Sequence, residues 1–267
     1  MEVKNKTVWI TGASSGIGEA LTYALAAAGA GKIIISGRRL PELARVKANC
    51  PGSTDIVIQT LDVAKHDEIF TIAAAVQKAQ GIIDLLINNA GISQRGTVLE
   101  TGIEVDKRIM DVDFFGTVAL TKAVLPGMVK NGSGMILAMS SLSGKMGVPQ
   151  RSAYSAAKHA LHGFFDALRA ENTHLGIKVL LICPGYIRTD ISKNALNAAG
   201  EKAGKMDANQ ENGLSPETLA QRILKAIRKE EREIYVGGKE KLGVYLKRFF
   251  PGILAGILAK RGASGEN

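Results

Sequence analysis

Seven short apolar segments recur along the first 238 residues of the chain, and several are rich in β-branched side chains. They lie at residues 8–10, 33–36, 55–60, 84–91, 134–141, 177–185 and 234–238. Continuous apolar runs, as opposed to alternating ones, are typical of strands that are buried on both faces of a parallel sheet. The pattern therefore predicts seven buried strands.

Longer segments with apolar residues at helical spacing separate these strands. The predicted helices span residues 16–29, 41–49, 66–79, 104–129, 152–174 and 215–230. Strands that alternate with helices and are joined by right-handed crossovers form a doubly wound sheet covered on both faces. We therefore expect an α/β, Rossmann-like fold with a seven-stranded parallel sheet, in one domain over residues 1–238.

Two segments interrupt the alternation. Residues 190–214 are polar and rich in Gly, Asn and Ala, so we expect a mobile substrate loop before a helix that starts near Ser215. The tail, residues 239–267, carries an apolar stretch at 249–259 that is too short to span a membrane and is interrupted by Pro251. Its basic flanks suit an anionic lipid surface. A lid over a pocket, or a subunit contact, is the other interpretation.

Composition narrows the function classes. The chain has 267 residues and a net charge of +9, which suits an acidic partner such as nucleic acid, a membrane surface or an anionic small molecule. Only 5% of the residues are aromatic, and basic and aromatic residues are not interleaved, so we do not expect nucleic-acid binding. Cys50 and Cys183 lack CxxC spacing, so no disulfide framework and no metal site is predicted. We expect a cytoplasmic location, with peripheral membrane contact as an option.

A glycine-rich loop, TGASSGIG at residues 11–18, follows the first predicted strand. Glycines let the backbone turn tightly and approach a ligand, and the helix that begins near Gly16 points its N-terminal dipole at the loop. The spacing G-x-x-x-G-x-G between a strand and a helix predicts a pyrophosphate site. Its predicted residues are Gly12, Ser14, Ser15, Gly16, Ile17 and Gly18.

The end of the second strand indicates which dinucleotide is bound. An NAD site usually has a carboxylate here for the adenosine ribose, whereas this chain has Gly37 followed by Arg38 and Arg39. Arginine pairs bidentately with phosphate, so the 2′-phosphate of NADP(H) fits better than NAD(H). Ser14 can add a hydroxyl donor to the same phosphate.

Several motifs in the same order resemble the short-chain dehydrogenase/reductase family over about residues 6–238. They are TGASSGIG (11–18), LDV (61–63), NNAG (88–91), YSAAK (154–158), CPGYIRT (183–189), and a serine thirteen residues before the tyrosine. The resemblance implies an NAD(P)-dependent oxidoreductase. It assigns adenine contacts to Asp62 and Val63, the adenosine-side ribose to Asn89, Ala90 and Gly91, and the nicotinamide carboxamide to Ile187 and Thr189, with Pro184 and Gly185 also at the cofactor.

The resemblance also implies a homodimer or homotetramer, often formed through the helices at 104–129 and 152–174. Residues 206–217 and 244–254 are similar to a branch that acts on lipophilic carbonyls and alcohols, some of whose members are membrane-associated. We therefore expect a lipophilic or medium-sized substrate, with contacts from residues 190–214, from 94–99 and from the tail.

Tyr154 and Lys158 are four residues apart, so both side chains lie on one helix face. The pair alone also suits an ordinary amphipathic helix. In the family's reaction, a proton must reach the alkoxide that hydride transfer leaves, and the resemblance gives that role to Tyr154. The Lys158 ammonium favours the phenolate and is expected to hold the nicotinamide ribose. Ser141 is expected to orient the substrate oxygen, with Ser140 and Ser143 as competitors and a simple backbone cap as the alternative for Ser141.

Asp113 departs from the family pattern, because the related segment N-x-x-G-T usually carries Asn at this position. Aspartate keeps the backbone carbonyl but loses the amide donor and adds a negative charge near Lys158. We expect a weaker enzyme whose activity changes on Asp113→Asn. The alternative is an NADP-binding regulatory or scaffold protein with weak or no turnover.

Overall fold

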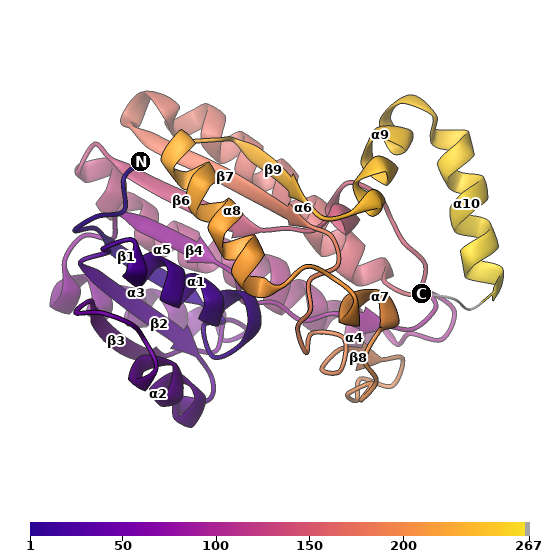
Figure 1. The fold of residues 1–267 in the computed structure, drawn as a ribbon, viewed down its shortest axis with the longest axis horizontal. Helices are drawn as coiled ribbons and strands as arrows, with labels where there is room; N and C mark the ends of the chain where they lie inside the picture. The colour runs from indigo at the N-terminus through magenta and orange to yellow at the C-terminus, as the bar shows by residue number, and fades with distance from the viewer. Residues whose placement is uncertain (265–267) are drawn as a thin grey trace.

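The structure, a computed structural model, describes residues 1–264, and a seven-stranded parallel sheet runs through its centre (Figure 1). The strand order is β3-β2-β1-β4-β6-β7-β9. The strands are β1 Thr7–Thr11, β2 Lys32–Gly37, β3 Asp55–Thr60, β4 Leu85–Asn88, β6 Gly134–Met139, β7 Ile177–Pro184 and β9 Glu233–Val236. All seven predicted strands are confirmed.

The register of the sheet explains why the strands read as continuous apolar runs. Val8 pairs with Ile33 and Trp9 pairs with Ile34 in adjacent parallel strands, and all four side chains are fully buried. The chain leaves β1 toward β2 and β3, then returns to place β4 on the other side of β1. Such a reversal opens a crevice at the carboxyl ends of the strands, which is where α/β folds bind ligands.

Helices cover both faces of the sheet. They are α1 Gly16–Ala27, α2 Leu40–Ala48, α3 His66–Gln80, α4 Ile103–Met110, α5 Gly116–Lys130, α6 Ser152–Asn172 and α8 Pro216–Lys229. The apolar sides of α1, α2 and α8 share one core cluster, whereas α3, α5 and α6 share the other. Burying a Leu or Ile side chain is worth about 1.5–3 kcal/mol. Apolar packing between the helices and the two faces of the sheet therefore stabilises the fold.

The segment predicted as one helix at 104–129 is divided by a π-helical turn, Asp111–Phe115, between α4 and α5. Such turns often lie at functional sites. This turn places Asp113 in the interior with no exposed surface. Among the described residues, the run 103–130 is the one helix long and apolar enough to cross a membrane. In this fold the buried side of its α5 part packs on one face of the sheet.

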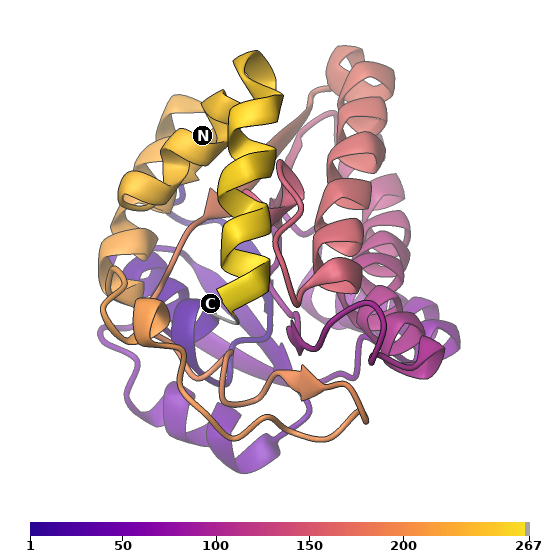
Figure 2. The same ribbon diagram turned by 90° about the vertical axis from the view of Figure 1, so that its right-hand side faces the viewer.

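Further elements lie at the carboxyl ends of the strands, where periodicity predicted none (Figures 1 and 2). β5 Gln94–Arg95 pairs with β8 Leu196–Asn197, and α7 Ala208–Glu211 follows in the predicted substrate loop. The tail forms α9 Leu242–Phe249 and α10 Pro251–Ser264. These additions surround the crevice described next.

Candidate active site

A cavity of about 1030 Å³ lies at the carboxyl ends of the strands. The predicted site residues that line it are Gly12, Ser14, Ser15, Gly16, Ile17, Arg38, Arg39, Asp62, Val63, Asn89, Ala90, Gly91, Asp113, Ser141, Tyr154, Lys158, Pro184, Gly185, Ile187 and Thr189. Gly18 alone among the predicted residues is not part of the lining. The fold therefore gathers residues from six strands and their loops into one site.

The glycine loop is shaped for close approach. Gly12 has φ +66°, and a Cβ there would lie 2.8 Å from Ala90 Cα. Gly16 has φ +58°, a backbone conformation that side chains disfavour. A Cβ on Gly18 would lie 2.3 Å from Gly12 O, so Gly18 lets helix α1 pack beneath the loop. The loop thus leaves backbone surface and a helix N-terminus facing the cavity, which fits a pyrophosphate.

Asn89 fixes this loop to the neighbouring strand. Its Nδ2 donates to Thr11 O at 3.0 Å and to Gly12 O at 3.2 Å. Thr11 Oγ1 in turn accepts hydrogen bonds from the backbone N–H groups of Asn89 and Ala90, both at 3.1 Å. The asparagine motif therefore acts as a brace between the ends of β1 and β4.

Two arginines stand at the end of β2. Arg38 and Arg39 both line the cavity, and Arg39 Nη2 donates to Ser14 Oγ at 3.4 Å. Arg45 is nearby but is held by two hydrogen bonds to Glu19, at 2.7 and 2.8 Å. The guanidinium groups that face the cavity at this point are therefore those of Arg38 and Arg39.

Helix α6 presents Tyr154 and Lys158 to the opposite part of the cavity. Lys158 Nζ lies 5.5 Å from the centroid of the Tyr154 ring and donates to Met139 O at 3.0 Å. Its ion-pair partner is Asp113, with Nζ and Oδ2 3.1 Å apart. Both ends of this ion pair are buried.

The charges of the buried pair depend on each other. Burial raises the pKa of Asp113, and this effect is opposed by Lys158 and by the Ile92 N–H, which donates to Oδ1 at 2.8 Å. Burial alone would lower the pKa of Lys158, but the Asp113 carboxylate reverses the direction and raises it. The ammonium beside Tyr154 is therefore compensated by a carboxylate instead of standing alone.

Ser141 caps a turn of the backbone and also lines the cavity. Its Oγ accepts from the Ser143 N–H at 3.1 Å, which caps a short 3₁₀ turn, and donates to Pro184 O at 3.4 Å, yet the residue also lines the cavity. The Ser140 hydroxyl is already engaged by Lys158 O at 3.2 Å and His162 Nε2 at 2.9 Å. Ser140 therefore supports the helix that carries Lys158.

A partly buried arginine pair on the same side had no signal in the sequence. Arg95 and Arg151 both donate to Asp207 Oδ2, at 3.2 and 2.8 Å. Burial, together with the neighbouring Arg151, lowers the pKa of Arg95 to about 10. The three residues join β5, the start of α6 and the predicted substrate loop. They are far apart in the chain, so only the fold reveals them.

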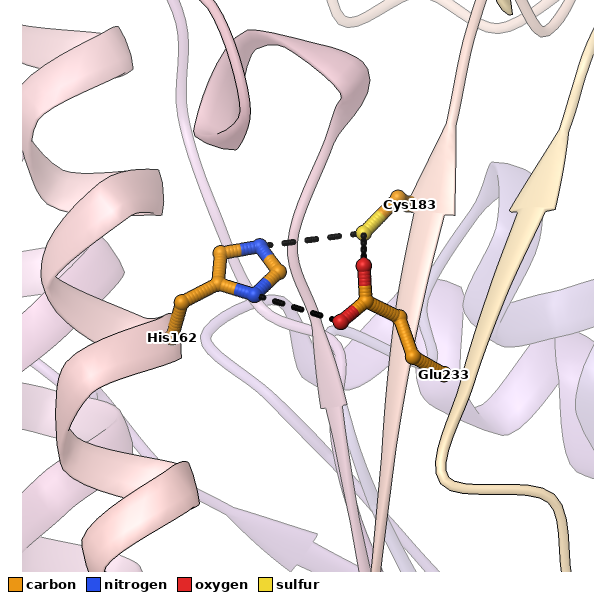
Figure 3. A group of neighbouring side chains, drawn as sticks. All are labelled: His162, Cys183 and Glu233. Carbon is orange, nitrogen blue, oxygen red and sulfur yellow. Dashed lines mark hydrogen bonds and ion pairs between the residues drawn. The ribbon is translucent and has the colours of Figure 1, made fainter. Parts of the chain in front are cut away.

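A second polar cluster lies behind Ser140. Figure 3 shows His162 of α6 facing Cys183 of β7 and Glu233 of β9. Each residue offers one atom that could bind a metal ion, and these three atoms lie within 4.8 Å of one another. Three such groups can hold a metal ion. Here Lys145 Nζ already lies 2.8 Å from Glu233 Oε1, and burial raises the pKa of the Cys183 thiol. Because Lys145 supplies the positive charge, we interpret the cluster as a packed polar network.

Acidification should destabilise the protein through His162. Burial, with a contribution from the charge of Lys145, lowers the pKa of His162 to about 4, against 6.5 for an ordinary histidine. Below pH 6.5 the unfolded chain takes up a proton that the folded chain does not, so the free energy of unfolding falls between pH 6.5 and 4. The full shift corresponds to about 3 kcal/mol, and solvent screening reduces our expectation to about 2 kcal/mol. Urea unfolding at both pH values measures it.

The matched variant for this prediction is His162→Gln, which cannot titrate in this range. The difference in unfolding free energy between pH 6.5 and 4 should be about 2 kcal/mol smaller in the variant than in the unmodified chain. Equal pH dependence of the two proteins would show that His162 is not the group responsible.

Comparison with known sequences agrees with the motifs. The sequence model of a family described as short chain dehydrogenase matches residues 6–200. A Drosophila melanogaster protein called dehydrogenase/reductase SDR family protein 7-like is 44% identical over 273 residues, covering 100% of this chain and 83% of the relative. A Mus musculus protein, dehydrogenase/reductase SDR family member 7B, is 40% identical and covers 97% of this chain and 82% of its own length.

Solved structures share the fold over nearly the whole chain. A short-chain dehydrogenase from Streptomyces avermitilis has a TM-score of 0.79 at 31% identity, covering 97% of this chain and 95% of that chain. A Burkholderia phymatum enzyme in complex with NAD has a TM-score of 0.83 at 22% identity, covering 95% and 96%. A Burkholderia cenocepacia enzyme in complex with NADP has 0.80 at 24%, covering 97% and 99%. At these last two identities the likeness shows the fold, and the two structures differ in cofactor.

Proposed function

Because the chain belongs to the short-chain dehydrogenase/reductase family of nucleotide-binding oxidoreductases, we propose that it is an NADP(H)-dependent enzyme that interconverts a ketone or aldehyde and an alcohol. The observation that carries the proposal is that a phenol and an ammonium, Tyr154 and Lys158, share one cavity with a tightly turned glycine loop that leaves a helix N-terminus facing the cavity. The substrate of the proposal is lipophilic or of medium size.

The residues divide the work between cofactor and substrate. In the proposal, the loop Gly12–Gly18 holds the pyrophosphate, and Arg38 and Arg39 hold the 2′-phosphate. Asp62 and Val63 lie at the adenine. The bound nicotinamide supplies a hydride in reduction and accepts one in oxidation.

The chain's own residues manage the proton and the substrate oxygen. Tyr154 donates its hydroxyl proton to the alkoxide oxygen in reduction and takes a proton from the alcohol in oxidation. The Lys158 ammonium stabilises the phenolate that remains after donation. Ser141 orients the carbonyl oxygen by a hydrogen bond. Replacing the buried Asp113 removes the negative charge that compensates the Lys158 ammonium beside the Tyr154 phenol.

A substrate panel tests the proposal directly. Aliphatic, aromatic and lipid-like ketones and aldehydes are assayed with NADPH and with NADH, and the corresponding alcohols with the oxidised cofactors. Oxidation of NADPH that depends on a carbonyl supports the proposal. Tight NADPH binding with no turnover across the panel would contradict it.

Arg38→Asp should reverse the cofactor preference. The variant removes a guanidinium from the cavity wall and adds the carboxylate that NAD sites usually carry. A lost charge-assisted hydrogen bond costs about 1.5–3 kcal/mol, so we expect the affinity for NADPH to fall about thirtyfold while that for NADH rises. Fluorescence titration with both cofactors measures the two dissociation constants.

The control for this variant is Arg222→Asp, the same charge change at an exposed position of α8 that is not part of the cavity lining. It should shift NADPH affinity by no more than about twofold, because exposed charges are screened. An unchanged NADPH-to-NADH ratio in Arg38→Asp would tell against the 2′-phosphate assignment.

A second candidate function rests on the Asp113–Lys158 ion pair. If the carboxylate cancels the pull of Lys158 on the phenol, the chain binds NADP but turns over slowly or not at all, and acts as a regulatory or scaffold protein. The panel above separates the two functions.

The remaining parts of the proposal concern assembly and place. We propose a homodimer or homotetramer, a catalytic domain at residues 1–238 followed by the tail at 239–267, and a cytoplasmic location with peripheral membrane contact through the tail. The helices α9 and α10 are the observation that supports the last point.

A further inference from the structure

The two C-terminal helices carry a group of exposed apolar side chains. Tyr245 is 53% exposed, Phe249 67%, Phe250 59% and Ile253 57%. These four residues, which we call the outer apolar face, are not among the described residues that line the cavity. Large apolar side chains that gather on a surface mark an interaction site more often than scattered ones do.

The charge of the same segment indicates what covers this face. Between residues 241 and 264 the sequence contains five Lys or Arg residues and no Asp or Glu. Lys247 and Arg248 lie in the last turn of α9, directly before Phe249 and Phe250. Aromatic residues beside cations, in a segment without acidic residues, match the interface of an anionic lipid bilayer.

A second copy of the chain fits this face less well. A symmetric contact through the outer apolar face would bring Lys247 and Arg248 of each copy together, and like charges oppose association. The helices of 8 and 14 residues are also too short to cross a bilayer. The face therefore suits a helix pair that lies in the lipid headgroup region.

The opposite side of the helix pair belongs to the cavity. Leu246, Leu254 and Leu258 line it and pack with Leu142 and Met146, which follow β6. Figure 2 shows α10 extending along the end of the molecule that carries the carboxyl ends of the strands. The helix pair α9 and α10 thus has apolar side chains on its outer surface and forms an apolar wall of the cavity on its inner surface.

We propose that the outer apolar face and its basic flanks dock on an anionic lipid bilayer, and that lipophilic substrates enter the cavity beneath α9 and α10 directly from that bilayer. The docking step stands on the surface alone. The entry step rests on the proposed function, because it concerns the substrate of that reaction.

Vesicle flotation of the full chain tests docking. The probes are vesicles of phosphatidylcholine alone and vesicles with 30 mol% phosphatidylserine (roughly the charge density that recruits basic helices). We expect binding to the anionic vesicles only, weakened about thirtyfold by the double variant Lys247→Glu, Arg248→Glu. Phe249→Ser, Phe250→Ser should weaken it at least about tenfold.

Matched controls keep the test specific. Arg222→Glu, Lys225→Glu makes the same charge change on exposed positions of α8, and Phe70→Ser removes an aromatic side chain that is 50% exposed on α3. Both controls should bind like the unmodified chain. Absence of binding to anionic vesicles, or equal binding by all variants, overturns docking. Docking is also overturned if the unmodified chain does not bind vesicles and the Phe249→Ser, Phe250→Ser variant changes oligomeric state, because the face would then contact a second copy.

Kinetics test the entry step separately. With a carbonyl that partitions into anionic vesicles, the Phe249→Ser, Phe250→Ser variant should lose about tenfold in kcat/KM. With a water-soluble carbonyl it should match the unmodified chain. Equal losses on both substrates, or on neither, overturn the entry route. Vesicle binding without turnover of any carbonyl would instead refute the proposed function and leave docking supported.

Discussion

Tyr154→Phe will lower kcat for carbonyl reduction by about 10³-fold. The variant removes the hydroxyl that donates the proton but keeps the ring, which packs in a small apolar cluster with Val105, Ala153 and Leu196. Fold and cofactor site should therefore persist, and NADPH affinity should stay within about twofold. Stopped-flow absorbance at the nicotinamide band measures kcat, and fluorescence titration measures cofactor affinity.

Tyr186→Phe is the matched control, because Tyr186 also lines the cavity and loses the same hydroxyl. It should keep kcat within about threefold. If Tyr154→Phe turns over like its parent while binding NADPH, the proton comes from another group and the proposed mechanism is wrong.

The strands and the glycine loop could be predicted because each depends on local chemistry. A strand buried on both faces must be apolar at every position, as at Ile33–Ile35, where all three side chains are fully buried. The loop needs glycine where a Cβ would strike a neighbour, as at Gly12 and Gly18. Such constraints leave a mark in a few consecutive residues.

The parts that escaped prediction depend on contacts between distant segments. The π-helical turn, which continues two ordinary helices, has no periodicity of its own. The pairing of Arg95 and Arg151 with Asp207 joins residues separated by up to 112 positions. The strands β5 and β8 have two residues each, too few for alternation to appear. Tertiary packing, not local sequence, decides these features.

For Asp113, the fold adds the distance and the burial that the sequence alone could not give. The sequence placed a negative charge near Lys158. The structure gives the geometry, an ion pair of 3.1 Å in which the carboxylate has no exposed surface. At that depth a charge is neither screened by salt nor free to turn away. We therefore expect the carboxylate to act on both stability and reactivity.

Asp113→Ala should lower the free energy of unfolding by about 3–5 kcal/mol, because it leaves the Lys158 ammonium buried without a counter-charge. Asp113→Asn should cost less, since its Oδ1 can still accept from the Ile92 N–H. The same Asn variant should raise kcat about tenfold near pH 7, the effect of roughly 1.4 kcal/mol, because Lys158 then pulls on the phenol without compensation. Urea unfolding and pH–rate profiles measure the two effects.

The alkaline limb of the pH–rate profile shows in which direction Asp113 shifts the pKa of Lys158. With Asp113 present, the pKa of Lys158 is raised, so the ammonium keeps its proton as the pH rises. In Asp113→Asn the carboxylate no longer outweighs the effect of burial on Lys158, so the pKa of Lys158 should fall. The rate should therefore decline at a lower pH than in the parent. Asp111→Asn, on the same π-helical turn, should leave both rate and profile unchanged. If Asp113→Asn does likewise, the carboxylate has no effect on catalysis, whereas an inactive parent that gains turnover on this change would favour the regulatory function over the enzyme.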